Sequence, residues 1–237
     1  MKLILLALYA VSAAAPAALA QISIKASDIT VAVRELNPKG PATPIPGWFL
    51  AGLNPRGYLL ALDDDVRHGG TRSASMRCRS ASCEDFGTVM QTIRADDYRG
   101  MRVRLTAWVR SENAGRANLW MRVDGFASRM GDASYGRPQS ATLDFDNMEN
   151  RKMRGTHDWT LQQIVLDVPK FASTVNYGLI LSGAGAAWID DIVLEVVDKK
   201  AKRTGLFPVR YGPKPSPEEL SRLNRYSTQP QNLGFEQ

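Results

Sequence analysis

Two tryptophans have the spacing that points most directly to binding chemistry. Trp108 lies in residues 103–110 and Trp120 in residues 118–124, and apolar and polar side chains alternate in both segments. Such alternation predicts half-buried β-strands. In a hairpin that pairs Trp108 with Trp120, the aliphatic side chains face inward and the two indole rings lie side by side on the outer face.

The neighbours of the two rings in this register are polar. An indole face stacks on the apolar face of a pyranose, while guanidinium and amide groups hydrogen-bond its hydroxyls. We therefore predict a site for a polysaccharide or cell-wall glycan, formed by Trp108, Trp120, Arg104, Arg110, Asn118 and Arg122. In the alternative interpretation, residues 126–141 or the N-terminal segment cover the rings, which then belong to the core.

Acidic residues give weaker support for catalysis. Asp144 and Asp146 are two residues apart and Glu149 is near, as the paired carboxylates of a glycosidase could be, but any short acidic stretch has this pattern. The sequence has no G-x-S-x-G, H-E-x-x-H or phosphate loop, and its two histidines lie in turn-like sequence. We assign no catalytic residue, and a small glycan hydrolase or lyase stays an alternative.

The first twenty residues have the pattern of a signal peptide. Lys2 precedes an apolar stretch at 3–11, and residues 18–20 form an A-x-A cleavage site before Gln21. No later segment approaches the roughly 18 apolar residues of a membrane span. We expect an exported protein, periplasmic or secreted, without an integral membrane segment.

Export decides how the two cysteines are interpreted. Cys78 and Cys83 are the only cysteines, and an oxidising compartment favours their pairing. A disulfide over so short a loop would mainly fix a turn between two strands. A metal site is less favoured, because His68 and His157 are the only histidines and there is no second ligand pair.

Composition and periodicity set the fold class. With 237 residues, 44% of them hydrophobic, the chain can bury a core and is neither collagen-like nor a coiled coil. The net charge of +6 is spread out except at residues 199–203, without a basic helix face, so we expect no nucleic-acid partner. Further strands are predicted at 22–33, 57–62, 73–79, 87–93, 161–168, 176–181 and 187–197. The prediction is an all-β fold of two packed antiparallel sheets.

Several strings also carry a family resemblance. Residues 98–110, 119–125, 145–148, 158–159, 181–185 and 188–192 resemble a bacterial extracytoplasmic jelly-roll module. Such modules are similar in plan to carbohydrate-binding jelly rolls and are also found attached to esterases, peptidases and regulators. The match covers about 47–197 and implies a jelly-roll β-sandwich at 21–197, but it is poor evidence for function.

The C-terminal region departs from this plan. Residues 198–231 are rich in Lys, Arg, Pro, Ser and Gln, which predicts a basic linker with a short helix at 217–223. Related modules open with an Asn-x-x-Phe-Glu strand before a Gly-Trp pair, and here that string lies at 232–236 instead. We therefore expect residues 232–237 to return as an edge strand of a monomer or of a strand-swapped dimer. A remnant of a second module is the alternative.

The resemblance also implies a cofactor. Jelly rolls of this plan often bind calcium between the opening and closing strands, which here would use Glu236 and Asp191. Solvated carboxylates at strand ends are the alternative.

Three function classes follow from these predictions. The favoured one is a non-catalytic glycan-binding protein of the cell envelope or the secreted fraction. The others are an interaction or assembly module that uses the C-terminal strand, and the hydrolase or lyase named above.

Overall fold

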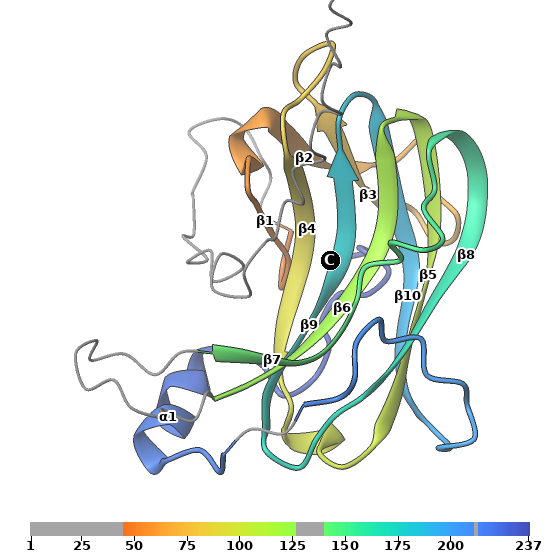
Figure 1. Cartoon of the computed structure of the whole chain (residues 1–237). Coiled ribbons are helices and arrows are strands. Elements are labelled where there is room, and N and C mark those ends of the chain that lie inside the picture. Colours follow the sequence, from red (N-terminus) through yellow and green to blue (C-terminus); the bar gives the residue numbers. More distant parts are fainter. Residues whose placement is uncertain (1–44, 127–139, 211–212) are drawn as a thin grey trace, which may run out of the picture. The chain divides into compact units, whose positions relative to one another are not determined.

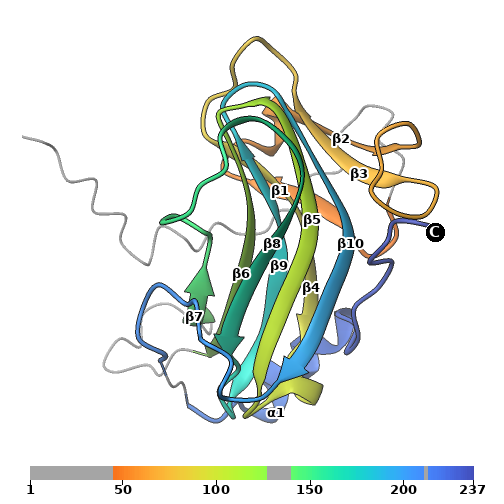
Figure 2. The same ribbon diagram turned by 90° about the vertical axis from the view of Figure 1, so that its right-hand side faces the viewer.

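The computed structural model describes residues 45–126, 140–210 and 213–237, which form a sandwich of two antiparallel sheets with five strands each (Figure 1, Figure 2). Sheet A has the order β1-β4-β9-β6-β7 and sheet B the order β2-β3-β10-β5-β8. The predicted all-β jelly roll is therefore confirmed. The signal peptide at 1–20, the strand predicted at 22–33 and most of the loop at 126–141 lie outside the described residues.

Eight of the ten strands overlap predicted segments, whereas the strands at Phe49–Gly52 and Ser140–Asp146 were not predicted. Sheet A contains β1 (Phe49–Gly52), β4 (Phe86–Arg94), β9 (Ala172–Ser182), β6 (Arg116–Phe126) and β7 (Ser140–Asp146). Sheet B contains β2 (Tyr58–Asp63), β3 (Ser73–Cys78), β10 (Ala186–Val197), β5 (Arg102–Ala114) and β8 (Gly155–Asp167). No helix in the described ranges is long and apolar enough to cross a membrane.

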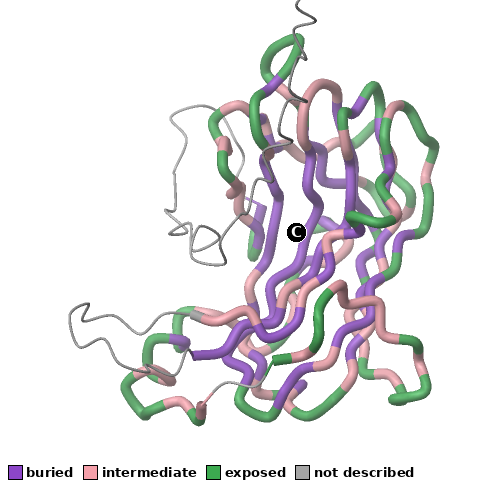
Figure 3. The backbone as a smooth tube through the Cα atoms, in the orientation of Figure 1, coloured by how far each residue is buried: buried purple, intermediate pink, exposed green. Residues whose placement is uncertain are grey.

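Alternation within each strand divides the core from the two outer faces. In β5, Leu105, Ala107 and Val109 are buried between the sheets, and Trp108 points away from them. In β6, Leu119 and Met121 are likewise buried between the sheets. The buried residues accordingly follow the central strands (Figure 3).

The predicted hairpin between β5 and β6 is wrong. β5 pairs with β8 and β10, whereas β6 pairs with β7 and β9, so the chain changes sheets at Gly115 between them. A side chain at Gly115 would lie 2.5 Å from the carbonyl oxygen of Ser182, which explains the glycine at this crossing. Alternation gave the correct facing of each tryptophan, but it cannot name the partner strand.

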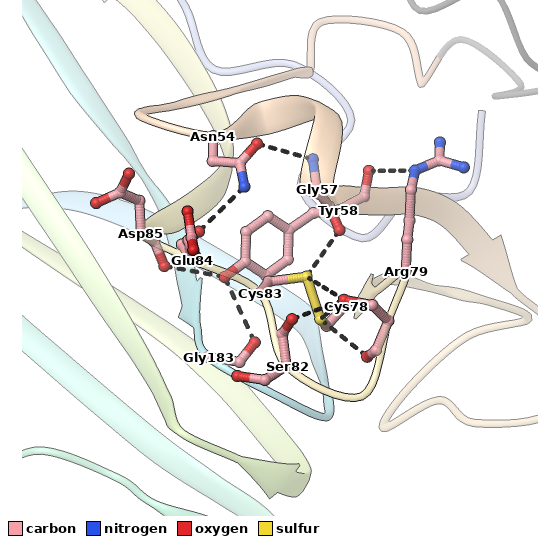
Figure 4. Close-up of a disulfide and its surroundings, with 11 residues drawn as sticks. Asn54, Gly57, Tyr58, Cys78, Arg79, Ser82, Cys83, Glu84, Asp85 and Gly183 are labelled. Atoms are coloured by element: carbon pink, nitrogen blue, oxygen red, sulfur yellow. Dashed lines mark hydrogen bonds between the residues drawn. A yellow bond between two sulfur atoms is a disulfide. The ribbon is translucent and has the colours of Figure 1, made fainter.

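The predicted disulfide is confirmed. Cys78 ends β3 and Cys83 precedes β4, and their Cα atoms are 5.8 Å apart (Figure 4). The ring of Tyr58 lies beside this loop, and its hydroxyl donates to the carbonyl oxygen of Asp85 at 3.0 Å. The bridge therefore secures the passage from sheet B to sheet A.

Residues 198–210 are not a free linker, and we call them the strap. The amide of Thr204 donates to Val165 of β8 at 2.8 Å, and the amide of Leu206 donates to Phe145 of β7 at 3.0 Å. Because β7 and β8 belong to different sheets, the strap joins the two sheets at one edge. The Pro-rich, basic composition hid this contact, because the groups that bond to the strap, among them Asp144 and Val165, are distant in the sequence.

The short helix predicted at 217–223 is confirmed in its first part. It appears as α1 (Pro217–Ser221), followed by a 3-10 turn at Arg222–Arg225. Ser216 and Glu219 form a capping box in which each side chain accepts from the other residue's amide, so the start of the helix is encoded locally.

Residues 232–237 return to the sandwich but as a turn, which corrects the predicted edge strand. Asn232 and Phe235 have left-handed φ values of 46° and 59°, so the segment cannot stay extended. Phe235 is nonetheless fully buried, 5.1 Å from the ring of Trp48. The segment therefore packs into the core beside Trp48.

Candidate functional site

The six predicted ligand-binding residues do not form one site. Arg104, Trp108 and Arg110 lie on the outer face of sheet B, and Asn118, Trp120 and Arg122 on that of sheet A. The two faces therefore carry three of the predicted residues each.

On the outer face of sheet B, a loop covers Trp108. The ring of His68 stacks on it at 4.0 Å with an interplanar angle of 15°, and Trp159 meets His68 edge-on at 5.7 Å. Two carboxylates hold His68, because its amide donates to Asp190 at 2.8 Å and its Nδ1 lies 2.7 Å from Asp191. One face of Trp108 is thus already occupied by protein.

The arginines of this face are also engaged. Arg77 and Arg110 lie over the ring of Trp188 at 4.7 and 5.8 Å, and that ring is only 1% exposed. Arg104 pairs with Glu195 through two hydrogen bonds of 2.7 and 2.9 Å. Arg104, Trp108 and Arg110, which were predicted to contact a glycan, thus contact other side chains of the protein instead.

The outer face of sheet A carries an apolar cluster on the side turned away from the core. Met90, Trp120 and Ile180 form its centre, and Phe49, Ala51, Phe86 and Phe145 pack around them. We call these seven residues the outer cluster. Trp120 is 6% exposed and its Nε1 donates to Thr88 at 2.7 Å, so its ring is held in a fixed orientation. The half-buried phenylalanines form the more accessible rim.

A row of polar side chains, the polar ladder, adjoins the outer cluster. Thr92 donates to Asn176 Oδ1 at 2.9 Å, Asn176 donates to Asp124 Oδ2 at 3.0 Å, and Arg122 Nε donates to the same oxygen at 3.0 Å. The Arg122 guanidinium lies 6.0 Å from the Trp120 ring. Burial raises the pKa of Asp124, although Arg122 opposes this effect. The ladder thus presents fixed polar groups from β4, β9 and β6 beside aromatic surface.

A cavity of about 300 Å³ opens next to this face. Phe49 of the outer cluster and Thr92 of the polar ladder both line it, so the three features are continuous. Its other lining residues are Gly47, Trp48, Gln91, Arg225, Tyr226, Ser227 and Gln231.

Asn118 is better explained as a structural residue. Its Nδ2 donates to the carbonyl oxygens of Asn147 and Met148 at 3.2 and 3.4 Å, and its Oδ1 accepts from the Met153 amide at 2.9 Å. The side chain is fully buried and fixes the connection between β7 and β8.

The carboxylates of the hydrolase alternative are also structural. Asp144 accepts hydrogen bonds from Arg203 and the Asp167 amide, and Asp146 accepts from Arg151 at 2.6 Å. They are 2% and 0% exposed, because they point between the sheets at edge strand β7. Neither carboxylate is available to a substrate.

The predicted calcium ligands do meet at one loop. A side chain at Gly69 would lie 2.6 Å from Asp191 Oδ2, and one at Gly70 would collide with Glu236 Oε1. Glu236 accepts from the Thr71 amide at 2.8 Å, and hydrogen bonds from Thr71 lower its pKa. The described part of the chain contains no group of three or more metal-binding side chains. The two carboxylates fit calcium in donor type, and the remaining ligands would have to be backbone oxygens and water.

Sequence comparison gives one informative relative. No family model matches the chain. The uncharacterized HTH-type transcriptional regulator YbfP of Bacillus subtilis (strain 168) is 35% identical over 162 residues, which are 68% of this chain and 51% of YbfP. The chain thus spans about half of that relative's length. Within the described residues, the only α-helix is the five-residue α1, so a helix-turn-helix is not found there.

Solved structures of similar fold include a CBM22-1 xylan-binding domain from Paenibacillus barcinonensis Xyn10C, with 17% identity and a TM-score of 0.42 over 64% of this chain and 86% of that one. Another is tailspike protein 4 of bacteriophage CBA120, with 16% identity and a TM-score of 0.44 over 65% of this chain and 20% of that one. At these values the likeness concerns the jelly-roll fold alone.

Proposed function

We propose that this protein binds glycans without catalysis, through the outer face of sheet A. The observation that carries the proposal is the continuity of the outer cluster, the polar ladder and the cavity. The main core lies on the other side of this sheet, and accessible apolar side chains that gather on an outer face, here the half-buried Phe49, Phe86 and Phe145, mark binding surfaces. Aromatic rims beside fixed hydrogen-bonding groups suit a sugar, which has an apolar face and polar edges.

The hydrolase alternative is not favoured, because Asp144 and Asp146 are buried in ion pairs. The assembly alternative is not favoured either, since Phe235 packs on Trp48 of its own chain.

A glycan array probed with the mature chain tests this function, with paired variants on the two faces. We expect Trp120→Leu and the less buried Phe145→Ala to weaken binding about tenfold, or ~1.4 kcal/mol. Trp108→Leu on sheet B is the matched control and should leave the affinity within about twofold of the parent. Each variant is first checked by its melting temperature. If Trp108→Leu abolishes binding while Phe145→Ala does not, the site is on the other face, and if no glycan binds, the proposed function is wrong.

We also propose that the protein works outside the cytoplasm, after removal of residues 1–20. The disulfide between Cys78 and Cys83 supports this, because such bonds persist in oxidising compartments. Intact-mass measurement of exported protein should give a chain that begins at Gln21. A start at Met1 in the periplasmic fraction would contradict it.

A second proposal is that Asp191 and Glu236 help to hold a structural calcium ion at the loop of residues 68–72. It is favoured by the approach of both carboxylates to adjacent glycines. Calcium should raise the melting temperature of the parent and not that of Glu236→Gln. Glu218→Gln is the control, because Glu218 is an exposed residue of α1, and calcium should raise its melting temperature as much as that of the parent. If calcium raises the melting temperature of all three proteins equally, it binds elsewhere. If it does not raise that of the parent, the proposed calcium site is wrong.

A further inference from the structure

The cavity beside sheet A is built from two distant parts of the chain. One wall comes from residues 47–49, 91 and 92, and the other from Arg225, Tyr226, Ser227 and Gln231. Without residues 225–231, this end of sheet A would be an open edge. Any ligand of the cavity therefore contacts a wall that the sandwich strands alone do not supply.

Hydrogen bonds to the backbone groups of Ser227 and Gln231 hold the second wall in place. The Arg94 amide donates to Ser227 at 2.8 Å. Gln91 and Gln231 bond reciprocally, with Nε2 of Gln91 donating to the Gln231 carbonyl and the Gln231 amide donating to Gln91 Oε1, both at 2.8 Å. Trp48 Nε1 also donates to the Gln231 carbonyl, at 3.2 Å. The cavity is thus preformed, which reduces the entropy cost of binding.

Most polar groups of the walls are already used. Gln91 Oε1 also accepts from the Tyr177 hydroxyl at 2.8 Å, and Thr92 donates to Asn176. Arg225 is different, because its guanidinium lies 4.7 Å above the Tyr226 ring and forms no ion pair within the described ranges. No Asp or Glu among the described residues lines the cavity. The cavity therefore offers one cationic group, oriented by an aromatic ring, with no acidic group to neutralise it.

From this arrangement, and on the basis of the glycan-binding function proposed above, we infer that the cavity binds a carboxylate-bearing sugar, a uronic acid residue of an acidic glycan. The Arg225 guanidinium can pair with the sugar carboxylate through two N–H groups. Phe49 and Tyr226 provide ring surface for the pyranose. A volume of about 300 Å³ suits a single sugar ring, and the adjoining outer cluster would receive the next residues of the chain.

Matched pairs of ligands test this inference directly. Oligogalacturonates and oligoglucuronates are each compared with their carboxyl methyl esters, which keep the stereochemistry of the rings and remove the charge. By titration calorimetry at low salt, we expect the parent protein to prefer the acid of at least one pair about tenfold, since charge-assisted pairing is worth more than a neutral contact. Arg225→Gln should bind acid and ester equally.

Arg222→Gln is the matched control, because it removes the same charge three residues away, where Arg222 pairs with Glu218 at 2.7 Å. It should keep the tenfold preference. Loss of the preference in both variants would show general attraction by positive charge and would overturn the inference, as would equal binding of acid and ester by the parent. In those cases the glycan-binding function stands. If neither acids nor esters bind and the glycan array is also blank, both proposals fail.

Discussion

The outer faces of the two sheets carry tryptophans at equivalent, outward-facing positions of consecutive strands, yet the chain treats them differently. On sheet B, the loop around His68 stacks on Trp108, and Arg104 and Arg110 are engaged by Glu195 and Trp188. On sheet A, Trp120 packs within the outer cluster, and a distant segment adds a cavity at its side. The comparison teaches that a tryptophan and neighbouring arginines do not make a site by themselves. The segments that pack over these side chains decide whether a ligand can reach them.

The largest expected effect concerns the C-terminal segment that builds the sheet A site. Phe235→Ala removes a fully buried ring from its contact with Trp48, which should cost about 3–5 kcal/mol and lower the melting temperature by about 10 °C. Phe207→Ala, at a side chain that is 58% exposed, is the matched control and should change the melting temperature by less than about 2 °C. Equal melting of the two variants would mean that the segment does not support sheet A.

A smaller difference in stability is expected between variants that break an ion pair on each face. Arg122→Gln leaves Asp124 buried without its cation and should cost about 2–3 kcal/mol, whereas Arg104→Gln leaves the half-exposed Glu195 and should cost at most about 1 kcal/mol. Denaturant unfolding measures both. Equal costs would remove this distinction between the faces.

The same variant has a pH dependence with a definite sign. Burial already raises the pKa of Asp124 above its ordinary value, and loss of Arg122 should raise it further. A carboxyl whose pKa is raised on folding adds stability below its unfolded pKa and loses that contribution as the pH rises through the folded pKa. Arg122→Gln should therefore be closest to the parent in stability in acid. A difference that grows in acid would contradict this.

The smallest effect tests the cover over sheet B. His68→Ala should expose the face of Trp108 and increase quenching of tryptophan fluorescence by acrylamide, with the melting temperature lowered by only a few degrees, because His68 is an exposed residue. His157→Ala, an exposed histidine that bonds to the Arg154 carbonyl, is the control and should not change the quenching. Unchanged quenching in His68→Ala would mean that Trp108 is shielded by other groups.

The sequence allowed the fold to be predicted because alternation is a local signal. The inward positions of β5 and β6 and the facing of both tryptophans follow from the period of two residues. The pairing of these strands does not follow, because a tight turn and a change of sheet at Gly115 have the same sequence appearance. The burial of Asn118 does not follow from the pattern for a related reason, since its hydrogen-bond partners lie in the distant residues 147–153.

The candidate site was largely beyond prediction. Phe49, Thr92 and Asn176 occupy outward positions in strands, which is the only signal that could have found them, and nothing local relates β1, β4 and β9 to one another. Arg225 was placed in a linker because its segment is polar. Its segment is held through the backbone groups of Ser227 and Gln231, and the side chains that bond to them, Gln91 and Trp48, are more than 130 residues away in the sequence.

The hydrogen bond from Trp48 to the carbonyl oxygen of Asn232 joins residues 184 positions apart. Closing a loop of that length costs conformational entropy before the contact can form, so we expect this contact to form late in folding. We therefore expect a stage of folding in which the strands are paired but Trp48 is not yet covered by the C-terminal segment. During that stage the chain exposes apolar surface and unpaired strand groups, which makes the order of folding events a determinant of aggregation as well as of the finished site.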